Sequence, residues 1–188
     1  MRVIAGQYRS RRLQSLPGME IRPTSDRLRE TLFDILTAGN PDALQGTIWI
    51  DLFAGTGAVG IEALSRGAEK VYFVEIATAA SELIRKNLHS LRIETGFENL
   101  KLDAKRALKQ LDARGMQADY LFIDPPYDME NTYAETLQAL TDSRLLKLET
   151  VIIAEHRKQF DPGEKIGGLQ RYRLLKQGDA ALSFYRKA

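Results

Sequence analysis

The stretch TIWIDLFAGTGAVG, residues 47–60, decides the fold of this chain. Its apolar first part, 47–51, runs into a loop with Gly55, Gly57 and Gly60. Glycines permit positive φ angles and bring the backbone close to a ligand. The pattern predicts a buried strand that turns into a helix near residue 58, and ligands of open α/β sheets bind at such strand ends. The glycines alone are weak evidence for a ligand, because they also let a strand and a helix pack closely.

Apolar strands and helices alternate after this stretch. This alternation indicates a parallel sheet covered by helices on both faces. The last two apolar runs are separated only by Gln177-Gly178-Asp179, which fits a hairpin loop, so the final strand is expected to be antiparallel. The sequence therefore predicts a doubly wound, Rossmann-like α/β fold with a seven-stranded sheet. The expected strands are 47–51, 70–75, 98–102, 118–124, 151–155, 172–176 and 181–186, and the expected helices are 58–66, 78–91, 104–114 and 131–142.

The first 45 residues differ from the rest in pattern and in charge. We expect an extension, 1–45, with a hairpin over 2–5 and 9–13 and a helix that begins at 24–26, ahead of a catalytic domain, 46–188. Residues 1–30 carry seven arginines, no lysine and three acidic residues. Because a guanidinium binds two phosphate oxygens at once, these arginines favour a polyanionic partner over a merely solvated basic tail.

Composition excludes several classes of protein. The chain has no cysteine, which rules out disulfides, cysteine-bound zinc, iron–sulfur clusters and thiol nucleophiles. Two histidines, His89 and His156, are expected at the surface, and no metal site is predicted. Trp49 is expected in the core. No secretory signal is visible, and no apolar run approaches the roughly 18 residues of a membrane span, so the expected location is the cytoplasm.

Acidic residues lie at the ends of three successive predicted strands: Asp51, Glu75 and Asp103. S-adenosylmethionine carries no phosphate and presents an ammonium, which Asp51 could bind. Glu75 could accept from two ribose hydroxyls, each such charge-assisted bond contributing about 1.5–3 kcal/mol. Asp103 could accept from an adenine amino group. Glu75 alone would also suit a dinucleotide, and each acid could instead cap the helix that follows it.

The tetrad Asp124-Pro125-Pro126-Tyr127 is the sharpest signal in the chain. Two prolines stiffen the backbone, so the Asp124 carboxylate and the Pro125 carbonyl become fixed acceptors beside the Tyr127 ring. Two acceptors aimed at the hydrogens of an amino group on a base direct its nitrogen lone pair at a methyl donor, while the tyrosine stacks on the base. The alternative is a simple turn at the end of a strand. A base in a duplex would have to be flipped out to reach this corner.

These residues resemble those of the RsmD-type methyltransferases, which form N2-methylguanine in bacterial small-subunit ribosomal RNA. The resemblance spans essentially the whole chain and rests on residues 1–6, 22–30, 51–60, 62–68 and 124–127. It implies a class I methyltransferase fold, chemistry at the tetrad and an RNA-binding extension. Two positions depart from the family pattern: Ser10, where glycine is frequent, and Ala77, where aspartate is frequent.

The resulting site predictions fall into two groups. We expect S-adenosylmethionine at Asp51, Phe53, Gly55, Gly57, Glu75, Asp103 and Ala104, and RNA at Arg9, Arg11, Arg12, Arg22, Thr24 and Arg27. The expected partner is small-subunit ribosomal RNA, or its assembling particle, bound by a monomer. The alternatives are an adenine-N6 DNA methyltransferase, for which the extension looks too small, and a non-catalytic RNA-binding assembly factor on the same fold.

Overall fold

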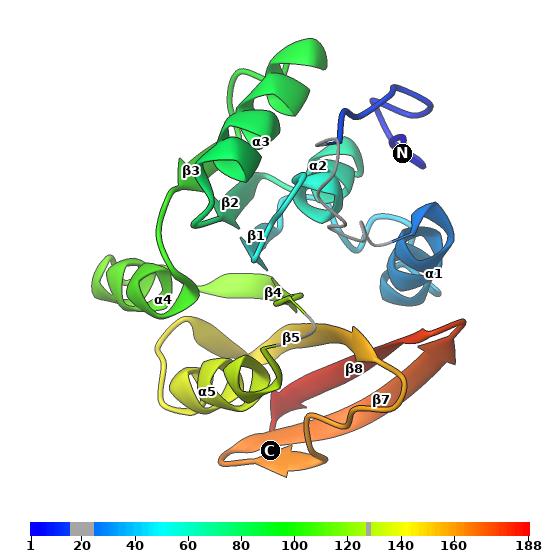
Figure 1. The fold of residues 1–188 in the computed structure, drawn as a ribbon. Coiled ribbons are helices and arrows are strands. Elements are labelled where there is room, and N and C mark those ends of the chain that lie inside the picture. The colour runs from blue at the N-terminus through cyan, green and yellow to red at the C-terminus, as the bar shows by residue number, and fades with distance from the viewer. Residues whose placement is uncertain (16–24, 127–128) are drawn as a thin grey trace.

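The computed structural model describes residues 1–15, 25–126 and 129–188, which form one mixed β-sheet flanked by helices (Figure 1). The helices are α1 (Asp26–Leu36), α2 (Ala58–Ser65), α3 (Thr78–Ser90), α4 (Ala104–Ala113) and α5 (Glu130–Thr141). The strands are β1 (Ile48–Leu52), β2 (Lys70–Val74), β3 (Phe97–Leu100), β4 (Ala118–Ile123), β5 (Leu146–Arg157), β6 (Lys165–Ile166), β7 (Leu169–Gln177) and β8 (Ala180–Lys187).

The order of strands confirms the predicted doubly wound fold. Five parallel strands lie in the order β3-β2-β1-β4-β5. The last strand, β8, pairs antiparallel with β5 on one side and with β7 on the other. The sheet also gains an eighth strand, β6, which pairs with β7 at the edge. With two residues, β6 is too short to leave an alternating pattern in the sequence.

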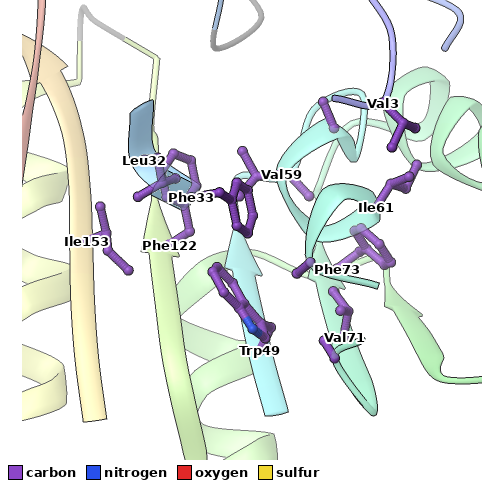
Figure 2. Packing of buried hydrophobic residues seen from close by; sticks show 14 of the residues in the cluster. Val3, Leu32, Phe33, Trp49, Val59, Ile61, Val71, Phe73, Phe122 and Ile153 are labelled. Carbon is purple, nitrogen blue, oxygen red and sulfur yellow. The ribbon is translucent and has the colours of Figure 1, made fainter. Parts of the chain in front are cut away.

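Helices cover both faces of the sheet. Successive residues of a strand point to opposite faces, so neighbouring residues pack against different helices. Trp49 of β1 belongs to a core cluster that includes residues of α1, α2 and α3, whereas its neighbour Ile50 belongs to a second cluster with residues of α4 and α5. Trp49 is fully buried, as predicted, and stacks on Phe33 of α1 with ring centroids 5.4 Å apart. Figure 2 shows Leu32 and Phe33 close to Phe122 and Trp49 of the sheet. The described part of 1–45 therefore shares a core with the rest, and a boundary at residue 45 stays a prediction.

Residues 1–15, here called the arm, form less regular structure than predicted. The two expected strands are reduced to one bridge between Arg2 and Arg12. The reason is that backbone N–H groups of the arm donate to side chains of α2: Ile4 and Ala5 to Glu62 at 2.7 and 3.0 Å, and Tyr8 to Ser65 at 3.0 Å. The arm still pairs with itself, since the Val3 N–H donates to the Arg11 carbonyl at 2.9 Å and the Leu13 N–H donates to the Met1 carbonyl at 3.2 Å, and its tip is docked on α2.

One turn, one helix cap and the two histidines can be compared with the sequence predictions. Ser10 has a φ of 67°, so it takes the left-handed conformation for which glycine is suited. Ser25 caps α1 by accepting from the Leu28 N–H at 3.1 Å. His89 is exposed, as predicted, but the surface prediction for His156 is wrong. β5 extends through Arg157, and pairing with β8 buries the His156 ring against Ser183.

None of the described helices combines the length and the apolar character that a bilayer span requires.

Candidate active site

A cleft of about 1530 Å³ opens at the carboxyl ends of the central strands. The chain leaves β1 toward β2 on one side, while β4 lies on the other, and open α/β sheets bind ligands at such a switch point. Pockets for one drug-sized ligand measure roughly 300–1,000 Å³. The cleft therefore has room for two reactants side by side.

The glycine loop, residues 53–57, borders this cleft, and its residues 53–56 line the inner wall, whereas Gly57 is not part of the described lining. Phe53, Gly55 and Gly57 have φ angles of 63°, 54° and 77°. The Gly57 N–H donates to the Ala54 carbonyl at 2.7 Å, which closes the turn before α2. Gly60 has a different role, because a Cβ there would lie 2.3 Å from the Phe73 ring. Its absence of a side chain lets α2 pack on β2.

Asp51 lies at the floor of the cleft with only 2% of its surface exposed. Its carboxylate accepts a hydrogen bond from the Gly60 N–H at 2.9 Å. Burial raises the pKa of Asp51 to about 8, although the Gly60 hydrogen bond lowers it, and the charge of Glu75 adds to the rise. A cation bound beside it would favour the ionised form. The position is therefore suited to an ammonium group.

Glu75 follows β2 and reaches across to the glycine loop. One carboxylate oxygen accepts from the Gly55 N–H at 2.9 Å, and the other accepts from the Ala77 N–H at 2.8 Å. A carboxylate offers about four lone-pair sites. Both oxygens can therefore still accept from a diol, and a ligand bound there would contact the acid that holds the loop.

Asp103 follows β3 and caps α4, which is the alternative role considered from the sequence. It accepts from the Arg106 N–H at 2.9 Å, and its second oxygen lies 3.3 Å from the Arg106 guanidinium. Asp103 and Ala104 nevertheless line the cleft. At the corresponding position of α3, Ala77 provides no side-chain cap. An aspartate there would cap the helix, so this departure from the family pattern removes a cap.

The corner Asp124-Pro125-Pro126 directly follows β4 and lines the same cleft. Pro125 is buried, Asp124 is half-buried and Pro126 is exposed. The Pro126 carbonyl accepts from the Met129 N–H at 2.9 Å, just before α5 begins. Tyr127, the last residue of the predicted tetrad, lies outside the described residues. The fold thus brings three tetrad residues to the cleft that holds Asp51 and the glycine loop.

The described lining is strongly acidic. It contains seven carboxylates and one arginine, Arg157. The carboxylates are Asp51, Glu75, Asp103, Asp124, Glu130, Asp161 and Asp179. Such a wall attracts a cationic ligand and disfavours pyrophosphate. This composition argues against a dinucleotide cofactor.

Sequence reasoning missed the outer wall of the cleft. Ile76 and Met129 line it with 65% and 47% of their surfaces exposed. Residues after β5, among them Gln159 and Phe160, complete the wall together with Asp179 of the turn between β7 and β8. No local pattern marks Gln159, Phe160 and Asp179, because they meet only when β5 and the final hairpin pair.

The predicted RNA-binding arginines lie apart from the cleft. Arg9, Arg11, Arg12 and Arg27 are exposed, and none belongs to the described lining. The Arg11 guanidinium donates to the Ser90 carbonyl at the end of α3 at 3.0 Å. Arg22 and Thr24 lie outside the described residues.

Strand order and cleft together define an α/β protein with the Rossmann-like methyltransferase fold. The structure of SMU.776 complexed with SAH has this fold, with a TM-score of 0.66 at 14% identity, covering 84% of this chain and 48% of that chain. The structure of a hypothetical protein from Thermus thermophilus, TTHA0928, is more similar. Its TM-score is 0.82 at 26% identity, with 98% of each chain covered.

The family follows from the sequence matches. A family model described as Conserved hypothetical protein 95 matches residues 1–186. Ribosomal RNA small subunit methyltransferase D of Escherichia coli (strain K12) is 33% identical over 189 aligned residues, which cover 94% of this chain and 90% of that protein. The chain belongs to this family, and its predicted resemblance to the RsmD-type methyltransferases is confirmed.

Proposed function

We propose that this protein transfers a methyl group from S-adenosyl-L-methionine to the exocyclic N2 amine of a guanine in small-subunit (16S) ribosomal RNA. The observation that carries the proposal is that the Asp124-Pro125-Pro126 corner and the glycine loop line one cleft. The name of the E. coli relative, ribosomal RNA small subunit methyltransferase D, supports the choice of RNA over DNA.

The residues of the inner wall fit this cofactor. Asp51 would bind its ammonium, Glu75 its ribose hydroxyls and Asp103 its adenine amino group, with Phe53, Gly55, Gly57 and Ala104 beside them. The acidic lining suits a ligand that carries an ammonium and a sulfonium. SMU.776, which shares the fold, is complexed with SAH. When bound, the cofactor supplies a methyl group whose bond to sulfur breaks as the new bond to nitrogen forms.

The corner after β4 would hold the target amine. The Asp124 carboxylate and the Pro125 carbonyl would accept its two hydrogens, so that the nitrogen lone pair points toward the glycine loop. Asp124 can then take the proton that the methylated nitrogen loses. Orienting two reactants in this way can lower the barrier by up to about 7–11 kcal/mol in favourable systems. Tyr127 would add about 1–3 kcal/mol by stacking on the base.

The target nucleotide must enter the cleft as an unpaired base. Extruding it from a helix costs a few kcal/mol, and the exposed arginines of the arm would hold the flanking phosphates. Because none of these arginines lines the described part of the cleft, phosphates and base would occupy separate surfaces.

Nucleoside mass spectrometry tests the proposal. The protein is incubated with S-adenosylmethionine labelled in its methyl group and with immature small ribosomal subunits, 16S RNA or double-stranded DNA. We expect labelled N2-methylguanosine from the ribosomal RNA and none from DNA. Label that appears only in DNA as N6-methyladenine would overturn the proposal in favour of an adenine methyltransferase.

A further inference from the structure

One buried amide joins the arm to the glycine loop. Asn87 of α3 is fully buried. Its Oδ1 accepts from the Gln14 N–H at 2.8 Å, and its Nδ2 donates to the Gln14 carbonyl at 3.2 Å and to the Thr56 carbonyl at 3.0 Å. Gln14 belongs to the arm, and Thr56 lies between the two glycines of the loop. A single side chain therefore holds backbone from two segments far apart in the sequence.

The hydrogen bond to the Thr56 carbonyl acts on a peptide between two glycines. Glycine adopts positive and negative φ with similar ease, so the peptide between Thr56 and Gly57 can rotate at little cost. In the structure Gly57 has a φ of 77° and begins α2 without a side-chain cap. Two hydrogen bonds fix one orientation of this peptide: the Gly57 N–H donates to the Ala54 carbonyl at 2.7 Å, and Asn87 donates to the Thr56 carbonyl at 3.0 Å. The shape of the cleft wall thus depends on a residue outside the cleft.

The arm is held to the same region by further contacts. The Thr56 hydroxyl donates to the Met1 sulfur at 3.8 Å, and Val3 and Leu13 are buried with 1% and 6% of their surfaces exposed. Gln14 itself is exposed, and the exposed Arg11 and Arg12 precede it by three and two residues. Movement of these arginines on RNA binding would therefore displace Gln14, whose backbone contacts Asn87.

We propose that Asn87 is a positioning residue that couples docking of the arm to the shape of the glycine loop. If RNA holds the arm in this docked position, RNA strengthens cofactor binding, and because coupling between two sites is reciprocal the cofactor strengthens RNA binding by the same factor. This inference rests on the proposed function for the identity of the two ligands. The central claim, that docking of the arm controls the affinity of the cleft for its ligand, depends only on contacts within this chain.

Binding of S-adenosylhomocysteine in the absence of RNA tests the claim that the arm controls affinity in the cleft. Gln14→Pro removes the N–H that donates to Asn87 and leaves the cleft untouched. Asn87→Leu removes all three hydrogen bonds. We expect each variant to bind S-adenosylhomocysteine about 5-fold or more weakly by calorimetry, a coupling at the low end of the usual 5- to 150-fold range. Wild-type affinity in folded Gln14→Pro overturns the inference, even if Asn87→Leu does not fold.

Asn99→Leu is the matched control. The Asn99 amide donates to the Ser81 carbonyl of α3 at 2.8 Å, but it contacts neither the arm nor the glycine loop in the hydrogen bonds described. We expect wild-type affinity from this variant. An equal loss in Asn99→Leu would reduce Asn87 to a general support of α3. Failure of the wild-type protein to bind S-adenosylhomocysteine would instead refute the proposed function.

A second measurement follows the coupling itself. The affinity for S-adenosylhomocysteine is measured with and without a saturating 16S RNA transcript. We expect RNA to strengthen binding about 5-fold or more in the wild-type protein and in Asn99→Leu. In Gln14→Pro, the ratio of the affinity with RNA to the affinity without RNA should fall to about one. A ratio that stays at the wild-type value in Gln14→Pro would overturn the role of Asn87.

Discussion

Asp51 shows how one buried residue can link binding to pH. In the unfolded chain its carboxyl ionises near pH 4, whereas burial raises its pKa to about 8 in the folded protein. The folded state therefore binds more protons between these values. The contribution of Asp51 to stability is complete below about pH 4 and is lost as the pH rises to about 8. Any ligand that brings a positive charge to Asp51 would reverse this loss.

We predict that Asp51→Asn removes this pH dependence. The amide stays neutral and can still accept from the Gly60 N–H. The free energy of unfolding of Asp51→Asn relative to wild type should rise between about pH 5 and pH 8, because only the wild type loses stability there. Urea unfolding at both pH values measures the difference. Asp142→Asn, at an exposed position, is the control, and a pH-independent difference for Asp51→Asn would contradict the prediction.

A second residue-scale prediction concerns Asp124. If its carboxylate orients the target amine, Asp124→Ala should lower kcat by at least about 10²–10³-fold, the usual cost of removing one preorganised polar group. RNA affinity should stay within a few-fold, since the arm is intact. Asp142→Ala, an exposed acid outside the described lining, should behave as wild type. Undiminished methylation by Asp124→Ala would refute the assigned role.

At the scale of elements, the sequence predicted what local periodicity determines. The alternation of strands and helices from β1 to α5 matches the structure, because continuous apolar strands and amphipathic helices are local patterns. The acids at the ends of β1, β2 and β3 could be predicted as neighbours, since the carboxyl ends of parallel strands meet at one edge. Of the predicted tetrad, the described residues Asp124, Pro125 and Pro126 lie at that edge as well.

What the sequence could not predict depends on tertiary contacts. The expected hairpin of the arm is shortened because Glu62 and Ser65 accept from the N–H groups of Ile4, Ala5 and Tyr8. Arg29 lies in the arginine-rich segment yet is fully buried, with its Nε 3.7 Å from Glu62. Its charge therefore serves docking of α1 on α2, and the number of arginines overstates the surface offered to RNA. The outer wall of the cleft at Phe160 could not be predicted either, because it also forms through tertiary contacts.

At the scale of elements, the testable prediction concerns RNA binding by the arm. Arg11→Ala combined with Arg12→Ala should weaken RNA binding and flatten its dependence on salt, because each lost phosphate contact lowers the slope by roughly 0.7–0.9 for single- or double-stranded nucleic acid. The affinity is measured by titration at several salt concentrations. Replacing Arg114, an exposed arginine at the end of α4 that pairs with Glu98, serves as control. An unaltered slope in the double variant would exclude the arm from the RNA contact.

At the scale of the whole molecule, charge is divided between two regions. The described lining of the cleft carries seven carboxylates and one arginine, whereas the arm carries exposed arginines. Under the proposed function, RNA phosphates would be repelled by the cleft and attracted by the arm. A neutral base can enter the cleft while the backbone stays outside. This division favours an unpaired nucleotide as substrate over a duplex lying flat on the protein.

The dimensions of the cleft lead to a kinetic prediction. Its volume of about 1530 Å³ can hold cofactor and base together, and the glycine loop and the Asp124 corner line it jointly. The chain has no cysteine that could carry the methyl group as a thioether. Direct transfer within a ternary complex is therefore expected, so initial rates measured while both substrates are varied should give intersecting double-reciprocal lines. Parallel lines, or a methylated protein isolated after incubation with cofactor alone, would show a two-step transfer, and the cleft would then need only one reactant at a time.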